Sequence, residues 1–308
     1  MGENFSVVFG QVLILFVMVV IGIISAKAKI INEKSAKSIT DFVLLFVCPA
    51  TIINSFYRKV DFSQVKSLGI VALVSFISFI ISILVAYIFI RDKNKASEKL
   101  YRFAVIFSNA GFMGLPLEQS LLGDQGVFYG AVYLGVFNIF VWTYGLFMMS
   151  SGKEKFSIKK IILNPGVLAV FIGLVIMITQ ITLPKIVISS LEMLSEMNAP
   201  LPMIIIGYYL SQLKKEDFKQ WKQYYAIFLR LVVVPLIVFG FLYIIKIDKT
   251  AALVCLIGAG TPVAAIEAMF AAKYDVGEKA AATLVSLSTL LSLLTLPLLL
   301  SFASTVLK

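Results

Sequence analysis

The sequence predicts an all-α integral membrane protein with ten transmembrane helices, and three observations carry this prediction. Of its 308 residues, 60% are hydrophobic and 14% are charged, against roughly 45–50% and 25% in soluble proteins. The mean hydropathy of +0.97 leaves too few polar side chains to cover a soluble fold. The apolar residues also fall into ten segments of about 20 residues, which is the length that crosses a bilayer.

The composition also narrows the classes of function. The chain has no histidine, which excludes histidine acid–base catalysis and histidine metal ligands. Cys48 and Cys255 each lie in an apolar run and suit packing better than metal binding. No nucleotide-binding loop or metalloprotease motif is present. We therefore expect no enzyme, cofactor or metal, and no nucleic-acid partner, because the net charge of +10 comes from short gaps between apolar segments.

The predicted spans are, in chain order, residues 7–26, 39–57, 67–90, 101–122, 126–149, 163–182, 186–211, 223–245, 251–272 and 279–303. The first has no basic region before it and no clear cleavage site, so it is a span rather than a signal peptide. The second and seventh contain Pro49 and Pro200 without glycine runs, which predicts simple kinks. The fourth and ninth contain stronger helix breakers.

Basic residues predict the orientation. There are 19 Lys and Arg residues in or at the edges of the gaps after spans one, three, five, seven and nine. The other gaps and the termini hold 7. Basic loops stay in the cytoplasm. The sequence therefore predicts a multi-pass protein of the cell membrane with both the N- and C-termini outside.

The two halves of the chain echo each other at an offset of 151 residues. Gly22 corresponds to Gly173 and Pro49 to Pro200. Residues 1–150 and 151–308 would each hold five spans. Because five is odd, the second half is inserted upside down, and such inverted repeats are common in secondary transporters.

Spans four and nine are predicted to be broken near their middles. Residues 108–117 read SNAGFMGLPL, with Gly111 and Pro116 among the breakers, and residues 258–262 read GAGTP, ending at Pro262. Proline and glycine interrupt helices, and irregular backbone at membrane depth occurs only inside protein or beside a wet cavity. The half-helix N-termini after two crossing breaks would attract a carboxylate. Ordinary kinks are the alternative.

Polar side chains at the breaks are the candidate substrate ligands. Asn109 offers both a donor and an acceptor, and Thr261 is the matching group in span nine. Both could instead cap the half-helices. Arg230, inside span eight, could supply countercharge. The predicted substrate site therefore comprises Asn109, Gly111, Pro116, Thr261, Pro262 and Arg230.

Two buried acids are the candidates for a coupled Na⁺ or H⁺. Glu118 follows Pro116 in the first turn of a half-helix, where it could also be a plain N-terminal acid. Glu267 lies about five residues past the second break. It is expected to face Arg230 or the same cavity, and a structural ion pair between these two is the alternative.

These motifs resemble the auxin efflux carrier family, whose bacterial members are often labelled malate or malonate transporters. The resemblance rests on residues 108–117, on residues 199–202 with Gly207, and on residues 261–275, and it covers nearly the whole chain. It implies two inverted five-span repeats, similar to bile-acid sodium symporters and sodium/proton antiporters. Spans one, two, six and seven would form an often dimeric scaffold, and spans three to five and eight to ten a moving transport domain. The family's site asparagine falls on Asn109 and its crossover proline on Pro262.

The sequence thus predicts a secondary transporter that moves small organic anions such as carboxylates by an elevator-type alternating access. Its expected partners are that anion, Na⁺ or H⁺, membrane lipid and a second copy of the chain. The first alternative is a sodium- or proton-coupled carrier, or a cation/proton antiporter, of the same architecture. The second is a membrane sensor that transports nothing.

Overall fold

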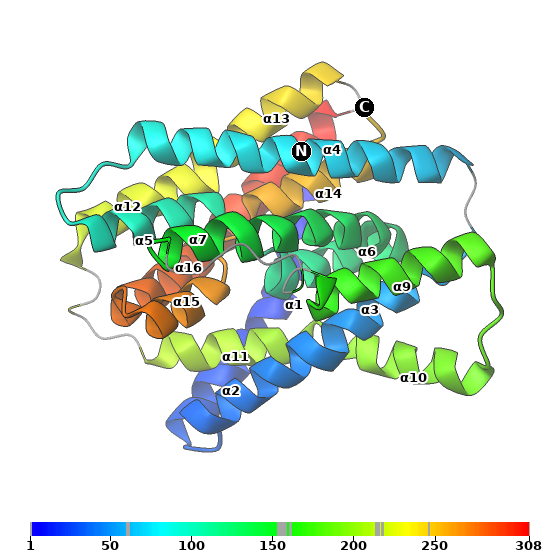
Figure 1. Cartoon of the computed structure of the whole chain (residues 1–308), viewed down its shortest axis with the longest axis horizontal. Helices are drawn as coiled ribbons and strands as arrows, with labels where there is room; N and C mark the ends of the chain where they lie inside the picture. The colour runs from blue at the N-terminus through cyan, green and yellow to red at the C-terminus, as the bar shows by residue number, and fades with distance from the viewer. Residues whose placement is uncertain are drawn as a thin grey trace.

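The computed structural model consists of helices joined by short connections (Figure 1). It describes residues 2–59, 62–152, 159, 162–212, 216, 219–245 and 247–307. In chain order the helices and π-helical turns (η) are α1 (Gly2–Lys27), α2 (Glu33–Phe42), η1 (Val43–Val47), α3 (Cys48–Phe56), α4 (Phe62–Phe89), α5 (Lys95–Ile106), η2 (Ala110–Gly114), α6 (Leu115–Phe140), η3 (Val141–Gly145), α7 (Leu146–Met149), α9 (Pro165–Thr179), α10 (Lys185–Glu196), α11 (Pro200–Ser211), α12 (Trp221–Phe228), η5 (Leu229–Val233), α13 (Val234–Ile245), α14 (Lys249–Gly260), α15 (Ile266–Tyr274) and α16 (Glu278–Val306).

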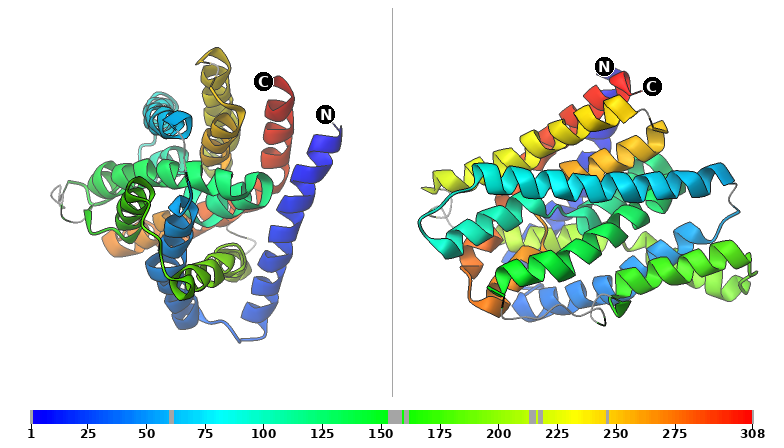
Figure 2. Two further views of the ribbon diagram at one scale, coloured as in Figure 1. Left: turned by 90° about the vertical axis from the view of Figure 1, so that its right-hand side faces the viewer. Right: turned by 45° about the horizontal axis from the view of Figure 1, so that its top comes forward.

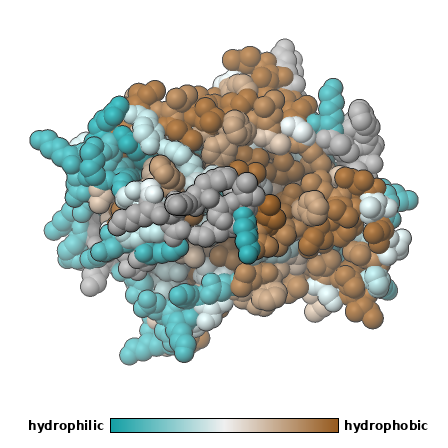
Figure 3. Space-filling model, viewed as in Figure 1, coloured by the Kyte–Doolittle hydropathy of each residue, from teal (hydrophilic) through white to brown (hydrophobic). Residues whose placement is uncertain are grey.

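The helices are long and apolar, as the composition predicts. Within the described residues, five helical stretches have the length and hydropathy needed to cross a membrane: Glu33–Phe56, Lys66–Phe89, Ala110–Met149, Trp221–Ile245 and Lys279–Val306. Large apolar side chains such as Phe76, Phe171 and Leu294 are exposed on the outside of the bundle. Figure 3 shows apolar residues over the upper and right-hand parts of one face, with polar residues gathered at the left and lower left. Such a surface suits lipid, and the chain is a multi-pass membrane protein.

Several predicted spans are built from more than one helix. Predicted span two comprises α2, η1 and α3, and predicted span eight comprises α12, η5 and α13. Predicted span seven is interrupted at residues 197–199, between α10 and α11. Pro200 is the first residue of α11, so the predicted kink is a full break in the helix. The reason is that proline, which lacks an N–H donor, is well suited to the first turn of a new helix.

The helices pack in two groups. Helix α1 lies along α11, and α3 lies against α9 and α10, whereas α6 packs on α4 and α14, and α16 packs on α14 and α15. The groups touch where α16 meets α1 and where α6 meets α3 and α9. The start of α1 and the end of α16 lie beside each other at the same end of the molecule (Figure 2).

Helix α6 changes direction at Gly123. This glycine has φ 62° and ψ −153°, so α6 consists of two helical pieces. A Cβ atom at Gly126 would lie 2.5 Å from the carbonyl oxygen of Glu118, which shows that the second piece lies against the first. Left-handed residues also follow α15, at Asp275 and Gly277. Glycine occupies such positions without steric cost.

Two glycines bring the backbones of α1 and α11 into contact. A Cβ atom on Gly22 would overlap the carbonyl oxygen of Ile204, and one on Gly207 would overlap that of Val19. Small residues of this kind allow close helix packing in membranes, where the hydrophobic effect gives little help.

We expect Gly207→Ala to lower the free energy of unfolding by about 3 kcal/mol, because the added methyl group forces the two helices apart. Thermal unfolding of the purified protein measures this change. Gly240→Ala is the matched control, because a Cβ at Gly240 would meet nothing within 4 Å. Equal unfolding temperatures for the two variants would contradict the close crossing of α1 and α11.

Ionic and hydrogen bonds join the connections at the polar end of the molecule. Lys222 pairs with Asp92 at 2.8 Å, and Lys99 donates to Ser151. The hydrogen bond from Lys222 lowers the pKa of Asp92. Nearby, Glu98 pairs with Lys95 and Arg102. The connections after predicted spans three, five and seven therefore meet at one end, as they must if all three lie on the same side of the membrane.

Candidate functional site

The candidate site is the place where two interrupted helices cross. The chain leaves the helical conformation after α5 and again after α14, and the two extended stretches pair in antiparallel fashion, with Ser108 opposite Val263. The N–H of Asn109 donates to the carbonyl of Pro262 at 2.7 Å, and the N–H of Ala264 donates to the carbonyl of Phe107 at 2.9 Å. The two breaks that the sequence predicts are therefore in direct contact.

Local chemistry explains where each helix stops. The carbonyl of Asn109 accepts the N–H groups of Met113 and Gly114, which starts the π-helical turn η2. On the other strand, Thr261 ends α14 with extended backbone angles, φ −64° and ψ 153°. The N–H of Val263 is accepted by the hydroxyl of Ser288 from α16 at 3.0 Å. Nearly every buried amide must find such a partner in the absence of water.

The side chains of Asn109 and Thr261 are both buried but differ in their partners. Asn109 is 4% exposed, makes no capping hydrogen bond, and its Nδ2 has no partner. Thr261 is fully buried and donates to the carbonyl of Gly258 at 3.1 Å. Thr261 therefore uses its hydroxyl donor at the end of α14, and neither side chain is an N-cap of the helix that follows its break. A buried donor without a partner is costly, which makes Asn109 available to a ligand.

The remaining predicted backbone residues frame the crossing. Gly111 lies in η2, and a Cβ there would touch only the Leu134 side chain at 3.5 Å. Pro116 is the second residue of α6, which directly follows the π-helical turn η2. Pro262 supplies the carbonyl that binds Asn109.

Arg230 is completely buried in η5 and reaches the first break from the side. Its Nη1 donates to the carbonyls of Val105 and Ile106 at 3.0 and 3.3 Å. These are among the last carbonyls of α5, where a helix favours a positive charge. The Nε and Nη2 atoms of Arg230 have no partner, so two donors remain free close to the crossing.

The carboxyl groups of the two predicted acids are buried and take no part in these contacts. Glu118 is 2% exposed and Glu267 is fully buried. Neither Oε2 of Glu118 nor either carboxyl oxygen of Glu267 has a hydrogen-bond partner. Among the ion pairs of the described residues, none joins Glu267 to Arg230. The alternative of a structural ion pair between these two residues therefore has no support among the described ion pairs.

Asn198 is a buried polar residue that the sequence analysis did not select. It lies in the interruption between α10 and α11, is 1% exposed, and has no partner for either side-chain polar atom. Its neighbour Met197 packs on the small apolar cluster that includes Phe112 of η2. The only signal in the sequence was an asparagine two residues before Pro200, which is also common in ordinary helix ends.

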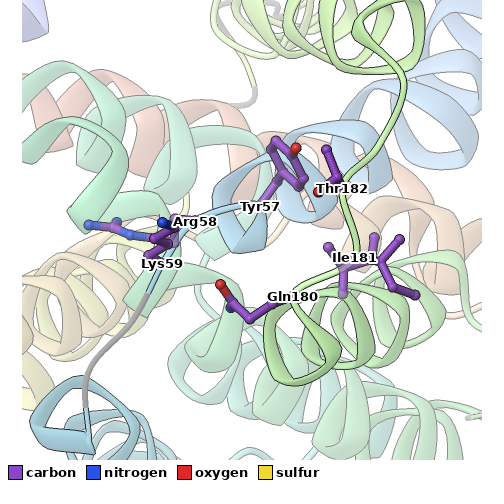
Figure 4. A pocket seen from close by; sticks show the side chains of 7 residues that line it. Tyr57, Arg58, Lys59, Gln180, Ile181 and Thr182 are labelled. Carbon is purple, nitrogen blue, oxygen red and sulfur yellow. The ribbon is translucent and has the colours of Figure 1, made fainter.

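A surface pocket of about 300 Å³ lies elsewhere, between the end of α3 and the end of α9 (Figure 4). Tyr57, Arg58, Gln180 and Thr182 contribute to its wall. Arg58 also donates to Gln125 at 2.8 Å. The pocket contains none of the predicted site residues.

Crossed, broken helices with buried polar groups in an apolar bundle define a membrane transport protein. The model of the family described as membrane transport protein matches residues 7–300, so the chain belongs to this family, and its resemblance to auxin efflux carriers is confirmed. An uncharacterized transporter of Methanothermobacter thermautotrophicus is 25% identical over 296 residues, covering 93% of this chain and 95% of the relative. An uncharacterized transporter of Methanocaldococcus jannaschii is 24% identical over 297 residues, covering 93% and 96%.

Proposed function

We propose that this protein is a secondary transporter of small organic anions, carboxylates above all. The observation that carries the proposal is the antiparallel pairing of the two breaks beside the unpartnered Nδ2 of Asn109. Paired interruptions of this kind are where transporters bind their substrates. Both relatives are also named transporters.

The chemistry around the crossing favours a negative charge. Helices η2 and α15 start directly after the breaks, and the free N–H groups of a helix start attract anions. Asn109 and Arg230 add buried donors without partners. A carboxylate has two acceptor oxygens that would satisfy these donors at once.

Transport requires that this buried site reach each side of the membrane in turn. We propose ten crossings in two inverted five-span repeats, residues 1–150 and 151–308. The scaffold would comprise α1, α2–α3, α9 and α10–α11, and the remaining helices would form the moving transport domain. Support comes from the two packing groups and from a separate small cluster in which Val43, Val47 and Ile205 contact Phe112. A small apolar contact of this kind suits sliding in an elevator-type movement.

The loop charges place the connections after α1, α4, α7, α11 and α15 in the cytoplasm, and hence both termini outside the cell membrane. A second copy of the chain would join through the scaffold.

A cation-coupled carrier or a cation/proton antiporter is the second candidate, and the buried, unpartnered carboxyls of Glu118 and Glu267 favour it. Flux driven by a Na⁺ or pH gradient without any organic anion would identify that activity.

A ligand screen tests the anion proposal directly. Purified protein should unfold at a higher temperature with small mono- or dicarboxylates, because a ligand at 100 times its Kd stabilises the folded state by about 2.7 kcal/mol. The positive compounds should then enter proteoliposomes but not empty liposomes. Amines of the same size serve as the control. Stabilisation and uptake limited to amines or metal cations would contradict an anion site.

A further inference from the structure

Gly130 leaves room for the buried carboxyl group of Glu118, and Gly126 lies against the backbone carbonyl of the same residue. Gly126 and Gly130 lie one helical turn apart on the second piece of α6. A Cβ at Gly130 would overlap Oε2 of Glu118 and would lie 3.0 Å from the side chain of Leu115. The backbone at Gly130 therefore forms one wall of the space that this carboxyl group fills. Only glycine leaves that space open.

The carboxyl group has no compensating charge. Glu118 is 2% exposed, its Oε2 has no hydrogen-bond partner, and no described Lys or Arg forms an ion pair with it. A carboxylate in such surroundings is expensive, whereas a carboxylic acid is tolerated. The packing therefore fits the proton-bound form.

Among the described residues, Tyr133 of α6 itself and Cys255 of α14 lie within electrostatic reach of Glu118. Arg230 also lies within electrostatic reach of Tyr133. The described positive groups make no ion pair with Glu118. Arg230 binds the end of α5, and Arg58, after α3, binds Gln125.

Exposed residues follow this carboxyl group closely along the chain. Gln119, the next residue, is half-buried, and Ser120, Gly123 and Asp124 are exposed. The left-handed Gly123 joins the two pieces of α6, so a small movement at this turn would open the space around Glu118.

We propose that Glu118 is the group that binds and releases a proton during transport, so that the carrier moves its anion together with H⁺. On one side the carboxylate takes a proton from hydronium, so that an O–H bond of hydronium breaks and the O–H bond of the carboxylic acid forms. On the other side this O–H bond breaks, and a water molecule accepts the proton as hydronium. This inference rests on the proposed transport function. It assigns H⁺ as the coupling cation and Glu118 as its site. The anion would still bind at the helix crossing.

Infrared spectroscopy of the protein in lipid tests the protonation without any substrate. The carbonyl stretch of a protonated carboxylic acid should be present at neutral pH and should weaken in Glu118→Gln. Glu192→Gln, which changes an exposed carboxyl, should leave this band intact. An unchanged band in Glu118→Gln would show that the carboxyl group is ionised and would overturn the proposal.

Proteoliposomes test the coupling with a labelled carboxylate that the wild type takes up. A proton gradient directed inward, with the outside more acidic than the inside, should drive the accumulation of this carboxylate by the wild type. Glu118→Gln should lose this accumulation and keep the exchange of internal for external carboxylate. Accumulation by the variant, or loss of exchange from folded variant protein, would overturn the proposal. If the wild type takes up no carboxylate at all, the proposed anion function is rejected. The infrared result on the protonation of Glu118 does not depend on that outcome.

Gly130→Ala tests whether the backbone at Gly130 keeps space for the carboxyl group, without changing Glu118 itself. The added methyl group would displace the carboxyl group, so the variant should lose the pH-driven accumulation as Glu118→Gln does. Gly135→Ala, on the same piece of α6, is the matched control, because a Cβ there would lie 3.8 Å from Val170 in ordinary contact. Equal accumulation by both folded glycine variants would contradict the role of the wall.

Discussion

Replacing Asn109 by alanine is expected to reduce carboxylate uptake roughly 100-fold, because the carboxylate would lose one strong hydrogen bond to its charged group. Protein stability should stay close to wild type. The side-chain Nδ2 has no partner and the side chain makes no cap, so the truncation breaks no hydrogen bond at this nitrogen. The backbone N–H that binds Pro262 is kept in the variant.

Uptake into proteoliposomes and thermal unfolding must be measured on the same preparation. Asn54→Ala makes the same truncation on α3 at a half-buried position outside the crossing, and it should transport normally. Pro262→Ala is a milder test, because alanine keeps the carbonyl that accepts the Asn109 N–H. Wild-type uptake by Asn109→Ala would remove this residue from the site. A large fall in its stability would assign it a structural role.

The neighbourhood of each break could be predicted because its causes are local. Proline and glycine weaken a helix, so residues 108–117 and 258–262 could be selected from the sequence. The non-helical residues are 107–109 and 261–265, and the predicted breakers Gly111, Pro116 and Gly258 lie in helical turns. The pairing of Ser108 with Val263 was not predictable in its register. It depends on how two helices far apart in the chain cross.

The partners of the buried charges were also beyond the sequence. Arg230 was expected to face Glu267 or a shared cavity, but it donates to Val105 and Ile106. Hydropathy identifies a buried charge without showing which carbonyl lies beside it. The glycine wall around Glu118 was missed for the same reason, since Gly130 matters only because α6 turns back at Gly123.

Replacing Arg230 by methionine is expected to lower the free energy of unfolding by about 3 kcal/mol and to abolish uptake. Methionine keeps an unbranched apolar stem like that of arginine, but it is shorter and has no donor. The carbonyls of Val105 and Ile106 would lose the donor that Arg230 gives them at the end of α5. That end lies directly before the crossing, so the geometry at Asn109 would also change.

Arg230→Lys separates the structural role from the binding role. Lysine keeps the charge and can still reach the α5 carbonyls, so the thermal stability should largely return. It lacks the planar fork through which Nε and Nη2, both unpartnered here, would bind a carboxylate side-on. Stable protein with strongly reduced uptake is therefore the expected result, with the exposed Arg91→Met as a control that changes neither property. Full uptake by Arg230→Lys would restrict Arg230 to holding the end of α5, and unchanged stability in Arg230→Met would contradict even that role.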